Sequence, residues 1–168
     1  MVDEKADSVV DITLAPGEFF FGGGARRVHT LLGSCVAITM WHPTRHIGGM
    51  CHYLLATRGT SQRLSKGNYA DEAVQLFMNE IEREGTRPAD YEVKIFGGGN
   101  MFSPQPGTLN PQSINVSKNN ADEGPRLLAA HGFKVKASDL GGNSHRKIYL
   151  ELWNGDVWVQ RGASRNNA

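Results

Sequence analysis

The twenty glycines of this chain constrain its fold more than any other feature, because they cluster at the ends of short apolar runs. Glycines follow the runs at residues 19–21 and 93–96, and they precede the runs at residues 50–55 and 147–153. Glycine at a strand end adopts backbone angles with positive φ and lets neighbouring strands approach closely. A flexible linker would mix glycine with serine over a long polar stretch, which this chain lacks. The glycines therefore predict many short strands joined by sharp turns.

Periodicity of the apolar residues supports these strands and adds two helices. Asn154-Gly155 lies between two β-branched and aromatic runs, which predicts a hairpin. Apolar residues recur at intervals of three and four after Asn68, which predicts a helix that Asn68 caps and Gly85 ends. We expect strands at residues 9–14, 36–41, 47–55, 93–96, 147–153 and 156–160, and helices at residues 69–84 and 119–131. Helices interleaved with hairpins indicate an α+β fold with mixed layers.

Length and charge restrict the class of protein. A chain of 168 residues suits a single domain, with a core at residues 9–161 and a disordered tail at residues 162–168. The net charge of +1 argues against a broad basic face for nucleic acid. No apolar run approaches the roughly 20 residues of a membrane span, and the first residues lack the apolar segment of an export signal. We therefore expect a cytoplasmic protein with two reduced cysteines.

The segment from His29 to Leu55 contains the most informative pairing. Its two predicted strands flank His42-Pro43-Thr44-Arg45, which has the proline of a type I turn. A hairpin centred on Pro43-Thr44 places Cys35 directly opposite His52. Directly opposed residues share a face of the sheet, with Cβ atoms roughly 4.5–5.5 Å apart. A slip of one residue in this register would separate the two side chains.

This pairing supports two interpretations. In the first, His52 activates the Cys35 thiol as a nucleophile, and backbone N–H groups near Gly33 and Ser34 stabilise an oxyanion. In the second, Cys35 is a buried apolar side chain and His52 is a hydrogen-bonded core histidine. Strand alternation points Cys51 to the opposite face, which predicts a core thiol. The cysteines and histidines point in different directions, so we expect no zinc site.

Motifs along nearly the whole chain, from about residue 12 to residue 159, resemble one family. The motifs are Thr-Leu-Leu-Gly-Ser-Cys-Val-Ala at 30–37, Gly-Gly-Met-Cys-His at 48–52, Tyr-Ala-Asp at 69–71, Lys-Ile-Phe-Gly-Gly-Gly-Asn-Met-Phe at 94–102, Asp-Leu-Gly-Gly at 139–142 and Arg-Lys at 146–147. Their identity and order resemble the CheD-type chemoreceptor glutamine deamidases. Because six motifs occur together, the resemblance does not depend on any one of them.

The resemblance implies a hydrolase that converts glutamine side chains of methyl-accepting chemotaxis receptors to glutamate and releases ammonia. It implies Cys35 as the nucleophile, His52 as its base and Thr30 as the residue that orients the imidazole. Some family members have one more residue between the threonine and the cysteine, so His29 competes with Thr30 for the third role. The implied fold is a β-sandwich-like core of mixed sheets flanked by helices, similar to cysteine deamidase toxins. The resemblance implies no metal or organic cofactor.

The surroundings of the implied site are also open to interpretation. Gly49, Gly98, Asn100 and Arg63 are candidates for its rim or for substrate contacts. Arg63 belongs to the polar, basic stretch at residues 57–67, which would suit acidic neighbours of the receptor glutamines. The alternative for this stretch is an ordinary solvated loop.

Two other functions remain open from the sequence. A cysteine protease or transamidase could use the same Cys–His pair. A binding module could hold receptors or a CheC-type phosphatase without turnover. The resemblance implies a CheC-type phosphatase as a second partner, beside the receptors that would be the protein substrate.

Overall fold

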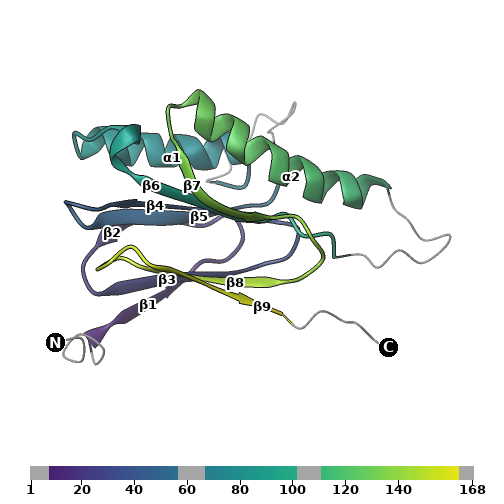
Figure 1. Ribbon diagram of the computed structural model, residues 1–168, viewed down its shortest axis with the longest axis horizontal. Coiled ribbons are helices and arrows are strands. Elements are labelled where there is room, and N and C mark those ends of the chain that lie inside the picture. Colours follow the sequence, from purple (N-terminus) through teal and green to yellow (C-terminus); the bar gives the residue numbers. More distant parts are fainter. Residues whose placement is uncertain (1–7, 57–66, 102–110, 163–168) are drawn as a thin grey trace.

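The structure consists of two β-sheets and one layer of helices (Figure 1). The computed structural model describes residues 8–56, 67–101 and 111–162. The four-stranded sheet has the order β1-β3-β8-β9, formed by β1 (Val10–Thr13), β3 (Arg26–Leu32), β8 (Arg146–Glu151) and β9 (Val157–Arg161). The five-stranded sheet has the order β2-β5-β4-β6-β7, formed by β2 (Phe19–Gly23), β5 (Ile47–Tyr53), β4 (Val36–His42), β6 (Glu92–Gly97) and β7 (Val135–Leu140). Both sheets are mixed, because β1 runs parallel to β3 and β7 runs parallel to β6.

The helices lie on one side of the five-stranded sheet, and the four-stranded sheet lies on the other (Figure 1). They are α1 (Ala70–Arg83) and α2 (Pro111–Ala130), with a short 3-10 helix η2 (Pro88–Asp90) before β6. Neither α1 nor α2 has the length and apolar character that crossing a membrane would require. The α+β fold with a β-sandwich-like core of mixed sheets and flanking helices is confirmed.

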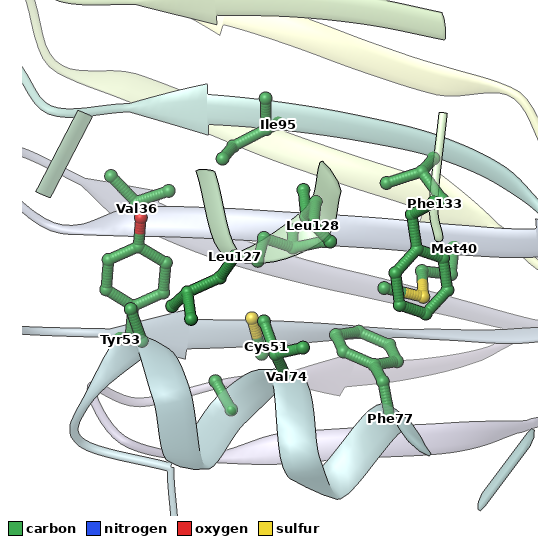
Figure 2. Packing of buried hydrophobic residues seen from close by; sticks show 14 of the residues in the cluster. Val36, Met40, Cys51, Tyr53, Val74, Phe77, Ile95, Leu127, Leu128 and Phe133 are labelled. Carbon is green, nitrogen blue, oxygen red and sulfur yellow. The ribbon is translucent and has the colours of Figure 1, made fainter. Parts of the chain in front are cut away.

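The middle sheet is buried on both faces, so the chain has two apolar cores. One core lies between this sheet and the helices, where Phe77 of α1 and Leu128 of α2 pack against Cys51 and its neighbours (Figure 2). The other core lies between the two sheets, where Ala37 and Met50 pack with residues of β3 and β8. Successive side chains of β5 therefore enter different cores.

Most of the predicted elements are confirmed, and their ends agree within two residues for all six strands and for α1. Three strands were missed, β2, β3 and β7. The charged or polar residues of β3 and β7 obscure their alternation, and most of the β7 side chains are exposed. The start of α2 at Pro111 instead of 119 is a second correction. Ser117, which lies before the predicted start, is a buried polar residue, so apolar periodicity could not reveal this part of the helix.

The predicted cap of α1 is wrong. The N-cap residue is Tyr69 and makes no side-chain cap bond. The backbone oxygen of Asn68 instead accepts hydrogen bonds from the N–H groups of Leu54 and Leu55, at 2.8 and 3.1 Å. Asn68 thus pairs with the chain that leaves β5, while Gly85, with a φ of 68°, follows the end of the helix as predicted.

The hairpin of β4 and β5 is confirmed, but its register differs from the predicted one. His42 pairs with Ile47, so the loop spans residues 43–46, and Ala37 rather than Cys35 lies opposite His52. The imidazole Nδ1 of His42 accepts hydrogen bonds from the N–H groups of Thr44 and Arg45, and the His42 carbonyl accepts one from His46 N–H. These bonds hold His46 at a φ of 54°. The loop is therefore centred one residue later than the predicted type I turn, which was centred on Pro43-Thr44.

Candidate active site

Cys35 lies in the short crossing between the two sheets, after β3 and directly before β4. Its side chain is partly buried and packs against the core between the sheets. The crossing is held by the glycine segment after β6, because Gly98 N–H donates to the Cys35 carbonyl and Gly99 N–H donates to the Gly33 carbonyl, each at 2.9 Å. Backbone bonds on both sides of the thiol therefore tie the crossing to the segment that follows β6.

The thiol and the imidazole of His52 belong to the same side of the middle sheet. Ala37 lies opposite His52, and Cys35 precedes Ala37 by two residues, so it takes the diagonal position. Diagonal neighbours on one face are about 7–8 Å apart at Cα, within reach of long or ring-bearing side chains. The register error of two residues leaves both side chains on one face, because side chains alternate with a period of two.

Thr30 determines which nitrogen of the His52 ring carries the proton. Its hydroxyl Oγ1 lies 2.6 Å from His52 Nδ1 and 2.8 Å from the carbonyl oxygen of Leu14. A carbonyl can only accept, so the single hydroxyl proton goes to Leu14, and His52 Nδ1 must donate to Oγ1. The neutral ring then carries its proton on Nδ1 and a lone pair on Nε2. Nε2 is buried and has no hydrogen-bond partner within the described ranges.

The structure places Thr30, and not His29, against the imidazole. Thr30 is buried between the sheets, and its neighbour His29 points to the opposite face of β3. There His29 stacks on Tyr149, with ring centroids 5.4 Å apart, and its Nε2 lies 3.0 Å from Thr13 Oγ1. Of the two candidates for the third role, only Thr30 contacts His52 in this structure.

Burial keeps both members of the Cys35–His52 pair neutral. It lowers the pKa of His52 from 6.5 to about 4, so the imidazole is unprotonated at neutral pH. It also raises the pKa of the Cys35 thiol above its usual value, although a hydrogen bond with Ser34 acts in the other direction. The resting pair is therefore a thiol and a neutral base.

Cys51 is confirmed as a core thiol. It is completely buried among the residues between the middle sheet and the helices (Figure 2). Burial raises its pKa to about 12, so it carries no thiolate at physiological pH. The chain therefore provides an internal comparison, since its two cysteines lie on opposite faces of the same sheet.

The low pKa of His52 predicts how stability depends on pH. Between pH 6.5 and about 4, the unfolded chain binds a proton at His52 that the folded chain does not bind, so stability falls as the pH falls. We expect His52 to account for a loss of about 3 kcal/mol in the free energy of unfolding across this window. Urea unfolding at pH 7 and pH 4 measures it, and His52→Gln should show a correspondingly smaller loss. Equal losses in the two proteins would contradict the prediction.

Gly97 allows the close approach of β6 to the Cys35 crossing. Its φ is 118°, and a Cβ there would lie 2.2 Å from the Cys35 carbonyl oxygen. We expect Gly97→Ala to lower the free energy of unfolding by at least about 2 kcal/mol, through strain and displacement of the crossing. Gly141→Ala is the control, because Gly141 has a φ of 83° but nothing within 4 Å of its Cβ. It should lose only about 1 kcal/mol in urea unfolding, and equal losses would contradict the steric argument.

The structure corrects the expectation that Gly49 lies at the rim. Gly49 is buried in the middle of β5, where it pairs with Met40 and Phe21. A Cβ there would lie 2.0 Å from the backbone oxygen of Phe20. Gly49 therefore permits close strand packing and does not face a substrate. Arg63, the basic candidate for the rim, lies outside the described residues.

Gly98 and Asn100 border an open pocket of about 440 Å³ beside the Cys35 crossing. Gly98 connects the two, because its N–H donates to the Cys35 carbonyl. The lining residues come from α2 and from the segments that follow β6 and β7: Gly98, Asn100, Ser117, Lys118, Ala121, Asp122, Leu140, Gly141 and Gly142. Lys118 and Asp122 form an ion pair of 2.8 Å on this surface.

Two buried polar residues near the site were not predicted. Asn120 of α2 donates hydrogen bonds from Nδ2 to the carbonyls of Ser34 and Leu54, at 3.1 and 2.7 Å. Arg146 of β8 is 2 % exposed and donates to the carbonyls of Gly97 and Gly141, which joins the four-stranded sheet to the glycine segments. Asn120 has no local sequence signal, since its acceptors are backbone oxygens of distant segments. Arg146 belongs to the Arg-Lys motif, but its burial depends on Gly97, which is 49 residues away.

Comparison with known proteins places the chain in a family. A family model described as "CheD chemotactic sensory transduction" matches residues 54–161. Two relatives named "Probable chemoreceptor glutamine deamidase CheD" are those of Pseudomonas syringae pv. tomato, 43 % identical over 93 % of this chain and 92 % of that protein, and Pseudomonas savastanoi pv. phaseolicola, 45 % identical over 90 % and 85 %. A relative from Leptospira interrogans, named "Probable chemoreceptor glutamine deamidase CheD 1", is 38 % identical over 94 % of this chain and 96 % of its own.

A more distant likeness is to a solved structure, the hypothetical protein YfiH of Bacillus licheniformis. It is 16 % identical, with a TM-score of 0.43 over 73 % of this chain and 49 % of that chain. This likeness is too remote to support an argument. The family model and the relatives cover the strands, the glycine segments and α2, and they show that the chain belongs to the CheD family.

Proposed function

We propose that this protein is a chemoreceptor glutamine deamidase that uses Cys35 as its nucleophile and His52 as its general base. The observation that carries the proposal is the buried Nε2 of His52, which has a lone pair and no partner among the described residues. Thr30 and Leu14 fix this lone pair by holding the proton on Nδ1. A base of fixed tautomer on the same face as a partly buried thiol suits nucleophilic catalysis.

The reaction proceeds in two halves. In the first, Nε2 takes the proton of Cys35 Sγ, and the thiolate attacks the carboxamide carbon of a receptor glutamine. The imidazolium then protonates the leaving nitrogen, so ammonia departs and a thioester remains. In the second half, His52 takes a proton from water, the hydroxide attacks the thioester, and the glutamate and the thiol are released. Glutamine and water are consumed, and glutamate and ammonia are produced.

Thr30 orients the base in both halves. When Nε2 gains a proton, Nδ1–H still donates to Oγ1, so the ring keeps its position as it becomes charged. Burial opposes the charged ring, but the thiolate formed at the same moment favours it. The two charges therefore appear together and stabilise each other.

The crossing before β4 also offers donors for the oxyanion. The N–H groups of Ser34 and Cys35 have no backbone acceptor in the part of the chain that the structure describes. Adjacent N–H groups beside a nucleophile are suited to a tetrahedral intermediate. The neighbouring carbonyls of Gly33 and Cys35 are held by Gly99 and Gly98, which keeps the orientation of these peptides fixed. Gly33 and Ser34 thus support the site through their backbone.

The substrate is a glutamine on the surface of a methyl-accepting chemotaxis receptor. The relatives are named as probable chemoreceptor glutamine deamidases, which supports a chemoreceptor glutamine as the substrate class. The open pocket bordered by Gly98 and Asn100 offers a concave surface for the receptor, and Gly98 N–H ties it to the backbone of the Cys35 crossing. Each turnover adds one negative charge to the receptor, which changes the electrostatics of its helix packing. The protein works in the cytoplasm, and a CheC-type phosphatase is a second partner.

Incubation with a receptor fragment tests this function directly. We expect ammonia release and a gain of about one dalton for each converted glutamine, because OH replaces NH2 on the side chain. Iodoacetamide, which alkylates the thiol, should stop both. Cleavage of the fragment would indicate a protease, and cross-linking to amines would indicate a transamidase. Binding without any change of mass would indicate a receptor-binding module, and each of these outcomes would overturn the proposal.

A further inference from the structure

The thiol and the imidazole lie at the point where the ladder between β4 and β5 ends. The last pair of this ladder joins Val36 with Tyr53. Cys35 precedes this pair and His52 lies one residue inside it, so hydrogen bonds of the sheet fix the imidazole strand more firmly than the thiol. Because the ladder has ended, a contact outside the sheet must set the distance between the Cys35 crossing and the end of β5.

Asn120 of α2 provides that connection. Its Nδ2 donates one hydrogen bond to the carbonyl of Ser34, the residue before the thiol, and a second to the carbonyl of Leu54, two residues after the imidazole. The side-chain amide thus bridges the two chains where the sheet no longer does. Both acceptors are backbone carbonyls, which determines that the nitrogen, and not the oxygen, faces them.

The surroundings of Asn120 favour a role for its donors in particular. The residue is completely buried, and its Oδ1 has no hydrogen-bond partner in the described ranges. An unpaired buried oxygen is unfavourable, so what the amide contributes at this position comes from its two N–H donors. The backbone oxygen of Asn120 accepts a hydrogen bond of 2.5 Å from the Tyr53 hydroxyl. This bond holds α2 against the end of β5 independently of the side-chain amide.

We propose that Asn120 is a positioning residue that sets the separation of Cys35 Sγ and His52 Nε2 by holding the Ser34 and Leu54 carbonyls together. It is buried beneath the crossing and does not contact substrate. The inference rests on the proposed deamidase function, because it assigns the geometry of that nucleophile and base. A displacement of reacting groups by about 1 Å can lower a rate by about 10²-fold.

Asn120→Asp tests this inference, since it keeps the shape of the side chain but removes both N–H donors. At a temperature where circular dichroism shows every variant folded, we expect kcat on receptor glutamine to fall about 10²-fold, with KM changed less than about twofold. Asn119→Asp is the matched control, because it adds the same charge at the exposed neighbouring position and should keep the wild-type kcat.

Tyr53→Phe distinguishes an effect on the positioning of the catalytic pair from a general loss of stability. It removes the bond that holds α2 through the Asn120 backbone, so it should lower the melting temperature while the amide, and therefore kcat, stays in place. A wild-type kcat in Asn120→Asp, or an equal fall of kcat in Tyr53→Phe, would overturn the inference. If Asn120→Asp does not fold, Asn120→Gln retains both donors on a longer side chain and should show the same selective loss of kcat. An inactive wild-type protein would instead disprove the deamidase function itself.

Discussion

Cys35→Ala is expected to abolish ammonia release from receptor glutamines, whereas Cys51→Ala is expected to retain it. Without Sγ no thioester can form, so the rate should fall by at least about 10³-fold. The Cys35 side chain is only partly buried, so its removal should change the stability little. Mass spectrometry of the receptor fragment measures the activity, and urea unfolding measures the stability.

Cys51→Ala is the matched control because it removes the same atom from the opposite face of the sheet. Cys51 is completely buried among the residues that pack beneath the helices, so the variant should lose about 1 kcal/mol of stability through the small cavity. Its activity should stay within about twofold of the wild type, since burial holds this thiol protonated. Similar activity of the two variants would contradict the assignment of the nucleophile.

Thr30→Val should lower kcat by about 10²- to 10³-fold, because valine keeps the shape of the side chain but cannot accept from His52 Nδ1. The imidazole would then be free to take the other tautomer, with the proton on Nε2, in which it cannot act as a base. The change also leaves the Leu14 carbonyl and Nδ1–H without their present partner, so stability should fall by about 1–3 kcal/mol. Thr30→Ser keeps the hydroxyl and should restore most of kcat.

Thr13→Val controls for the loss of a threonine–histidine contact as such. Thr13 Oγ1 lies 3.0 Å from Nε2 of His29, an exposed pair on the outer face of the four-stranded sheet. This variant should keep the wild-type kcat, because neither residue contacts His52. A large loss in Thr13→Val, with little loss in Thr30→Val, would transfer the third role to His29. Steady-state ammonia release by the four proteins decides between them.

The local pattern of the chain predicted most of its strands and α1, because periodicity reports which face of an element is buried. The interior of α2 shows the limit of this reasoning. Its second half carries the apolar residues Leu127 and Leu128, and this half was predicted. Ser117, before the predicted start, is buried although it is polar, and a buried polar residue leaves no apolar period in the sequence. Asn120 lies within the predicted helix, but its burial against the Leu54 carbonyl was not predicted for the same reason.

The same distinction applies to the pair of Cys35 and His52. Alternation in β4 and β5 predicted their common face correctly even though the register was wrong by two residues. The register itself depended on the His42 ring, which binds the N–H groups of Thr44 and Arg45. A turn propensity averaged over proteins does not contain such a side-chain contact.

The amino-acid sequence by itself determined the glycine-rich turns, the strands they end and the face that each cysteine takes, because these follow from backbone sterics and the twofold period of a strand. Only the tertiary structure decided that Thr30 rather than His29 meets His52, since that contact crosses from one sheet to the other. It also decided the low pKa of His52 and the bridging position of Asn120. Burial and long-range hydrogen bonds depend on which segments pack together, and no local pattern specifies that.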